Sequence, residues 1–163
     1  MTTRSKRQKL RLSASTFRFA IVVSTFNRSV TEKLLNGAQE CLKAHGLAKS
    51  RTKVFRCPGA LELPQVANAL VMSSRWDAVI CLGAVIRGKT PHFEYVAAET
   101  SRGIQQVALR SRTPVVFGVL TTDTEEQARE RAGGKHGNKG WDAAIAAIEM
   151  AALFKRIQRE ESA

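Results

Sequence analysis

Short apolar runs alternate with longer segments of helical periodicity through almost the whole chain, and this alternation restricts the folds available to it. Gly46 stops the first helical segment, and Thr124 with Gln127 forms a capping box before a short helix that ends at Gly133-Gly134. The runs of strand length are residues 17–23, 52–57, 77–82 and 114–120. The longer predicted helices are residues 29–45, 63–74, 91–110 and 141–158.

Continuous apolar strands that are separated by helices indicate a parallel sheet covered on both faces. Right-handed crossover connections then favour an α/β three-layer sandwich, with a flavodoxin-like four-stranded parallel sheet and helices on both faces. No internal repeat is visible. Residues 17–163 are therefore predicted to form one domain.

The beginning of the chain is strongly basic. The formal net charge is +12, and the excess is concentrated near the N-terminus, where residues 1–16 are expected to form a disordered tail. Such tails can contact nucleic acid, but a single aromatic, Phe17, accompanies the cations, so we do not favour that partner. The cations of this stretch are Arg4, Lys6, Arg7, Lys9, Arg11 and Arg18.

Composition excludes several classes of protein. The hydrophobic fraction of 44% is that of a globular domain. No apolar run reaches the roughly 18 residues that span a bilayer, and no signal-peptide pattern is present. Cys41, Cys57 and Cys81 are odd in number and have no metal-ligand spacing. We expect a cytoplasmic protein with buried thiols, no bound metal and no membrane partner.

Polar, glycine and aromatic residues follow each predicted strand, where ligands bind in such sheets. The stretch Gly83 to His92 is the richest, because it runs from a strand into a helix N-terminus. With Pro91 as first helical residue, Thr90 is the expected N-cap, and the free amides make an anion site that suits a phosphate. His92 would lie in the first turn, where the helix dipole favours its neutral form and proton transfer becomes possible. A histidine that merely hydrogen-bonds its helix is the alternative.

The same stretch matches G-x-x-x-x-G-K-T, the phosphate-binding loop of many nucleotide hydrolases. Val85 and Ile86 are β-branched, which is awkward in a loop that wraps its amides around an anion. Pro91 also moves the helix start beyond the point that this motif requires. A nucleotide-binding protein is therefore the second hypothesis.

The strand-end motifs resemble those of the lumazine synthases. The resemblance covers residues 17–154 with the motifs in the family's order. Its most specific part is Leu82 to Arg87 with Gly88, Thr90, His92 and Phe93. The other matching motifs are Phe26-Asn27, Pro58 to Pro64, Val115 to Thr121, Gln127-Ala128, Glu130 to Gly133, Gly137 to Gly140 and Ala147 to Ala151.

The resemblance implies a cofactor-free condensation of a ribitylaminopyrimidinedione with 3,4-dihydroxy-2-butanone 4-phosphate in riboflavin biosynthesis. His92 would transfer protons, and Phe26 would stack on the pyrimidine. Asn27 and Glu62 would bind the ribityl hydroxyls. The remaining binding residues that the resemblance implies are the backbone groups of Ala60, Leu61, Ala84, Val85 and Ile86, the phosphate ligands Lys89, Thr90 and Arg131, and Phe117 with Lys139 nearby.

The resemblance also implies assembly, because Phe117 reaches its pyrimidine across a subunit boundary in this family. A homopentamer is expected, and the short connection Gly133 to Gly140 favours a 60-subunit icosahedral shell. Riboflavin synthase is a candidate partner. Two residues depart from the family pattern: Leu61 stands where Phe is usual and Thr25 where Arg is common. A non-catalytic shell or nucleic-acid-binding scaffold on the same fold is the third hypothesis.

Overall fold

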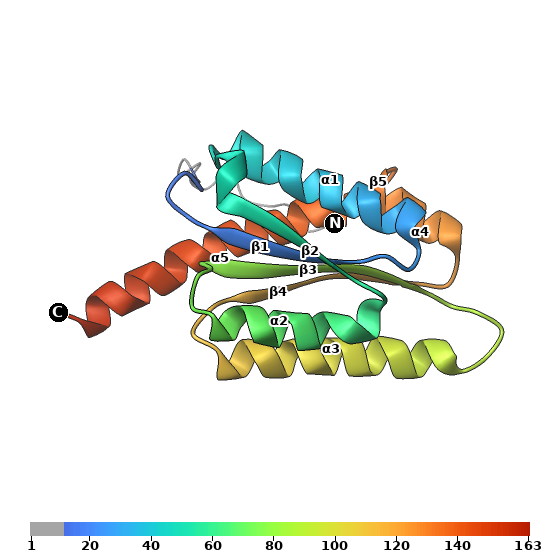
Figure 1. Ribbon diagram of the computed structural model, residues 1–163. Helices are drawn as coiled ribbons and strands as arrows, with labels where there is room; N and C mark the ends of the chain where they lie inside the picture. Colours follow the sequence, from blue (N-terminus) through green and yellow to red (C-terminus); the bar gives the residue numbers. More distant parts are fainter. Residues whose placement is uncertain (1–11) are drawn as a thin grey trace, which may run out of the picture.

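The computed structural model describes residues 12–163, which form a fully parallel four-stranded sheet in the order β2-β1-β3-β4 (Figure 1). The strands are β1 (Phe19–Ser24), β2 (Thr52–Cys57), β3 (Ala78–Ile86) and β4 (Val115–Thr122). The helices are α1 (Arg28–Ala44), α2 (Leu63–Met72), α3 (His92–Arg110), α4 (Glu125–Arg131) and α5 (Lys139–Glu161). Two 3-10 turns, η1 (Lys49–Arg51) and η2 (Ala60–Glu62), and a small hairpin of β5 (Ala132–Gly134) and β6 (Gly137–Asn138) complete the set.

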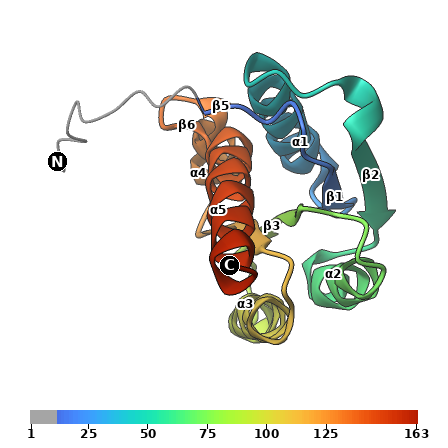
Figure 2. The ribbon, with the colours of Figure 1, turned by 90° about the vertical axis from the view of Figure 1, so that its left-hand side faces the viewer.

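Helices cover both faces of the sheet, which confirms the predicted α/β three-layer sandwich. Helices α2 and α3 lie on one face, and α1, α4 and α5 lie on the other (Figures 1 and 2). Successive residues of β1 point to opposite faces, so Ile21 packs in the core beneath α1 and α5 while Val22 packs beneath α2. Every residue of β1 is buried, as expected for a central strand with both faces covered.

Strand β3 is longer than the sequence predicts. Gly83 reads as the end of an apolar run, but the strand continues to Ile86 and pairs there with Thr122 of β4. Gly83 stays in the strand because a side chain would not fit: a Cβ there would lie 3.0 Å from Leu63 Cδ1 and 3.2 Å from Ser24 Oγ. Close packing, not a turn, explains this glycine.

The connection between α4 and α5 is a hairpin rather than the expected loop, and α5 begins two residues early. Gly133 and Gly137 have positive φ angles of 101° and 79°, which favour glycine. Asn138 caps α5, its Oδ1 accepting from the amides of Gly140 and Trp141 at 2.8 and 3.3 Å. The capping box of Thr124 and Gln127 is confirmed.

The expected basic tail lies largely in residues 1–11, outside the described residues. Residues 12–16, which the sequence assigns to the same tail, lie against the domain: Leu12 packs on the core, and the amide of Ala14 donates to His45 O at 2.8 Å. In the described part of the chain, no helix has the length and apolarity needed to cross a membrane.

Candidate active site

A cavity of about 500 Å³ lies at the carboxyl ends of β1, β2 and β3, beside the first turns of α3. We call it the strand-end cavity. It brings together residues that are separated by up to 70 positions in sequence, as the crossover topology requires. Of the predicted site residues, Phe26, Asn27, Ala60, Leu61, Glu62, Ala84, Val85, Ile86, Thr90 and His92 line it.

Hydrogen bonds tie the strand ends to one another around this cavity. Asn27 adopts the left-handed conformation, with φ at 56°, and its Nδ2 donates to Ala84 O at 2.8 Å. The amide of Phe26 donates to Pro58 O at 2.9 Å, which holds its aromatic side chain over the end of β2. Asn27 thus has a structural role besides the predicted one, and its Oδ1 is the oxygen left to accept from a ligand.

Glu62 is also partly engaged. Its Oε2 accepts from the amide of Gly59 at 2.9 Å, closing the η2 turn. The same carboxylate can accept further hydrogen bonds from a polyol, because an ionised carboxylate has about four acceptor positions. Next to it, the side chain of Leu61 is 51% exposed. Phe26, after the neighbouring strand β1, is 70% exposed. Large apolar groups at a cavity mouth are ready to cover an aromatic ligand.

The end of β3 supplies backbone groups to the cavity. Strand β3 pairs with β1 only as far as Leu82, but it pairs with β4 as far as Ile86. The edge of residues 83–86 that faces β1 therefore lacks a strand partner, and Ala84 O is met there by the Asn27 side chain. Unpaired backbone donors and acceptors of this kind can recognise the edge of a flat heterocycle.

His92 is the first residue of α3 and lines the cavity, as predicted. The predicted cap is wrong by one residue: Pro91, not Thr90, is the N-cap, because Pro91 O accepts from the amide of Glu94 at 3.1 Å and closes the first turn. Thr90 nevertheless lines the cavity beside the helix N-terminus. Lys89 is exposed and is not among the lining residues.

Sequence reasoning gave no role to Gly59, Gly88, Phe93 and Val96, which also line the cavity. Phe93 follows His92 directly, and Val96 lies four residues after His92, which is one helical turn. The spacing from His92 could have identified Val96.

The Cys57 thiol lies at the end of β2, where burial and then Glu62 raise its pKa to about 11, so it is no nucleophile at neutral pH.

The nucleotide-hydrolase interpretation is wrong. A phosphate-binding loop must curl so that successive amides point at one anion. Here Gly83 to Ile86 are extended and paired with β4, so most of the matching motif is strand. The remaining segment, residues 87–91, is too short to form that cradle.

The other predicted residues lie elsewhere. Phe117, Arg131 and Lys139 line a second hollow of about 370 Å³ along the edge strand β4 and the start of α5. We call it the β4 surface. It shares no lining residue with the strand-end cavity. Phe117 is 43% exposed there.

Both cations of the β4 surface bond to groups of their own helices. Arg131 Nη1 donates to Gln127 O at 3.0 Å, and its nearest carboxylate oxygen, on Glu130, is 3.9 Å away. Lys139 Nζ lies 3.1 Å from Asp142 Oδ2. Both side chains remain partly exposed, so their remaining donors can reach an anionic ligand.

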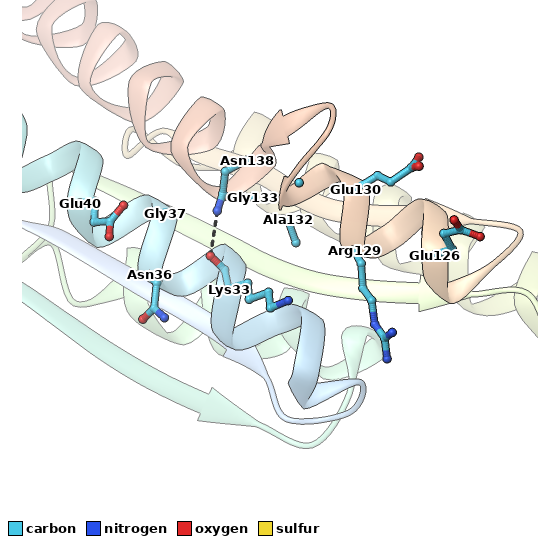
Figure 3. Close-up of a pocket in the computed structure, with 11 residues that line it drawn as sticks. Lys33, Asn36, Gly37, Glu40, Glu126, Arg129, Glu130, Ala132, Gly133 and Asn138 are labelled. Carbon is cyan, nitrogen blue, oxygen red and sulfur yellow. Dashed lines mark hydrogen bonds between the residues drawn. The ribbon is translucent and has the colours of Figure 1, made fainter.

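A third hollow of about 500 Å³ separates α1 from α4 and β5 (Figure 3), and it contains none of the predicted site residues. At its rim, Asn138 Nδ2 donates to Lys33 O at 2.9 Å (Figure 3). Gly140 permits this close approach of α5 to α1, because a Cβ there would clash with Leu34 O. The contact fixes the position of the hairpin between Arg131 and Lys139.

Comparison with known proteins identifies relatives of this chain. The family model described as 6,7-dimethyl-8-ribityllumazine synthase matches residues 16–155. A 6,7-dimethyl-8-ribityllumazine synthase of Clostridium kluyveri is 52% identical over 148 residues, which are 91% of this chain and 96% of that protein. The chain belongs to the 6,7-dimethyl-8-ribityllumazine synthase family.

Proposed function

We propose that this protein condenses 5-amino-6-(D-ribitylamino)uracil with 3,4-dihydroxy-2-butanone 4-phosphate, releasing phosphate and water, to give 6,7-dimethyl-8-ribityllumazine for riboflavin biosynthesis in the cytoplasm. The observation that carries the proposal is the strand-end cavity, which gathers an aromatic face, polyol acceptors, unpaired backbone groups and His92 in a chain of this family.

The two parts of the pyrimidine substrate fit two parts of the cavity. The flat ring would stack on Phe26 and use the free backbone edge of Ala84, Val85 and Ile86. The ribityl hydroxyls would donate to Asn27 Oδ1 and to the Glu62 carboxylate. Backbone groups of Ala60 and Leu61 would bind beside them.

The reaction needs proton transfers rather than a cofactor. The 5-amino group attacks the ketone, water leaves to form a Schiff base, phosphate is eliminated, and ring closure releases a second water. His92, exposed at the cavity, can pass protons to and from these groups. The amides near Lys89 and Thr90 at the α3 N-terminus, together with Arg131, would hold the phosphate.

A direct assay tests this function. Purified protein is mixed with both substrates, and formation of the fluorescent lumazine is followed. We expect product well above the slow uncatalysed reaction. No excess over that background would refute the enzyme and leave a non-catalytic scaffold on the same fold.

The β4 surface leads us to propose that each complete site is shared between two subunits. Phe117, Arg131 and Lys139 share no hollow with His92 in one chain, which supports a second copy as their route to the site. A homopentamer supplies such a copy to every site by symmetry. The short hairpin between α4 and α5 supports further closure into a 60-subunit shell, which could enclose riboflavin synthase.

Light scattering coupled to size-exclusion chromatography tests the assembly. A particle of about sixty chain masses is expected, since closed point-group symmetry fixes the number of copies. A particle of about five chain masses would refute the shell. An active monomer would refute the shared site.

A further inference from the structure

Arg87 connects the first turn of α3 to the segment that follows β4. Among the hydrogen bonds of the described residues, no other side chain links these two parts. Arg87 is the first residue after β3, and its amide donates to Thr122 O at the end of β4 at 2.9 Å. Its side chain reaches in two directions. Nε donates to Asp123 Oδ1 at 2.8 Å, and Nη1 donates to Glu94 Oε1 in the first turn of α3.

The same guanidinium covers the ring of Phe93. The Arg87 Cζ atom lies 4.4 Å from the ring centroid, within the range of a cation–π contact. Phe93 lines the strand-end cavity and follows His92 directly. With one ring face beneath the guanidinium, Phe93 keeps its edge and its other face for the cavity.

The charge and the hydrogen bonds around Arg87, in contrast to those around Arg131, make it unsuited to bind a phosphate. Two carboxylates, Glu94 and Asp123, already occupy its donors, and together they outweigh its charge. Their hydrogen bonds, Asp123 first, raise the pKa of Arg87, and the bond from Arg87 lowers the pKa of Glu94. Arg87 and Glu94 therefore stay ionised at neutral pH, and two carboxylates beside one guanidinium disfavour a phosphate there.

Stability alone does not account for this arrangement. The Arg87 side chain is 43% exposed, and exposed ion pairs contribute little to the free energy of unfolding. The planar guanidinium, however, fixes two carboxylates and one ring in a single orientation, which a lysine ammonium cannot do.

We propose that Arg87 is a positioning residue, which holds the first turn of α3, and with it His92 and Phe93, against the carboxyl end of β4. The proposal rests on the proposed function for its effect on turnover. Asp123 lies two residues before α4, and its amide donates to Gln127 Oε1 at 2.9 Å. Through Glu94 and Asp123, Arg87 thus fixes the first turn of α3 relative to α4, the helix that ends at Arg131.

The experiment compares Arg87→Ala and Arg87→Lys with a matched control, Arg102→Ala. Arg102 forms an exposed ion pair with Glu99 on the same helix, and neither residue lines the cavity. Turnover and Michaelis constants are measured for each variant. Backbone hydrogen exchange is measured over residues 91–95.

We expect Arg87→Ala to lower kcat about tenfold or more, because misplacing a reacting group by about 1 Å can cost up to a hundredfold. The Michaelis constant for the butanone phosphate should change little. Arg87→Lys should recover part of the loss, since it can keep one ion pair. Exchange over residues 91–95 should accelerate in Arg87→Ala and not in Arg102→Ala.

Three results would overturn the proposal: unchanged kcat in Arg87→Ala, an equal loss in Arg102→Ala, or a raised Michaelis constant for the butanone phosphate with kcat intact. The last result would make Arg87 a phosphate ligand. An inactive wild-type protein would refute the proposed function instead, and hydrogen exchange would then decide the positioning role by itself.

Discussion

The strand-end cavity and the β4 surface are built in opposite ways. The cavity lies between strands whose ends are tied together by short hydrogen bonds, as between Asn27 and Ala84. The β4 surface lies on an edge strand, and its cations, Arg131 and Lys139, are partly exposed and bond to groups of their own helices. The first is complete enough to bind a ring within one chain. The second has polar and aromatic groups from β4, α4 and α5 only, which is why we propose that another copy provides the opposing wall.

The largest expected effect is on chemistry in the strand-end cavity. His92→Ala should lower kcat about a hundredfold, the low end of general acid–base catalysis, because Schiff bases also form slowly without a catalyst. Pyrimidine binding should stay nearly intact, since Phe26 and Glu62 remain. Single-turnover lumazine formation and equilibrium titration of the pyrimidine measure the two effects.

His136→Ala is the matched control for that variant, because His136 lies on the exposed hairpin beside Glu130. Full activity in His92→Ala would mean that positioning alone, not proton transfer, accounts for the rate.

The end of β2, beside the cavity, can be tested chemically through Cys57. Its pKa is raised from 9.0 to about 11, chiefly by burial and secondly by Glu62. At pH 8 the thiol is therefore protonated, and its thiolate fraction is about a hundredfold below that of an ordinary thiol. Alkylation by iodoacetamide should be slow in the native protein, should accelerate as pH rises toward 11, and should become fast on unfolding.

Peptide mass spectrometry locates the modified thiol. Cys41, whose pKa is raised to about 12 by burial and then by Asp142, should react more slowly still. Rapid native alkylation of Cys57 at pH 8 would show that the strand ends are not closed as described.

The next effect concerns the β4 surface. Arg131→Ala should raise the Michaelis constant for the butanone phosphate about ten- to a hundredfold, because charged hydrogen bonds contribute about 1.5–3 kcal/mol. Turnover at saturation should change less.

Arg129→Ala is its control, since Arg129 lies on the same helix but pairs with Glu125 and lines the third hollow instead. An unchanged constant in Arg131→Ala, or an equal rise in Arg129→Ala, would remove Arg131 from the phosphate site.

The smallest effect concerns the mouth of the cavity. Leu61→Phe restores the residue that is usual in the family and should tighten pyrimidine binding about two- to tenfold, the value of one aromatic contact of about 0.5–1.5 kcal/mol. Isothermal titration measures it. Weaker binding would mean that the cavity mouth has no room for a Phe side chain at position 61.

The alternating pattern predicts the sheet and its helices, because apolar periodicity is encoded locally. The rule that ligands bind beyond the carboxyl ends of parallel strands then points to the residues of the strand-end cavity. The pattern does not predict the full length of β3. A glycine after an apolar run is typical of a strand end, and only the packing of Gly83 against Leu63 explains why the strand continues. The β5–β6 hairpin is too short to leave a periodic signal, and its glycines read as an irregular loop.

The separation of the two hollows is likewise invisible in the sequence. Phe117 and His92 stand only 25 positions apart, yet they line different hollows. Only the resemblance to the family, which implies that Phe117 reaches its pyrimidine across a subunit boundary, pointed to this separation. The separation of the two hollows within one chain is what leads us to propose that two copies supply the two halves.

Co-assembly of two impaired variants tests this central claim most directly. His92→Ala and Arg131→Ala subunits, carrying different affinity tags, are co-expressed, and doubly tagged particles are assayed beside each homogeneous variant. If each site takes His92 from one chain and Arg131 from its neighbour, random mixing leaves about a quarter of the sites intact. Activity should then rise to about a quarter of the wild-type value at subsaturating butanone phosphate. Activity no higher than the mean of the two homogeneous variants would place both residues in one chain's site and contradict the account.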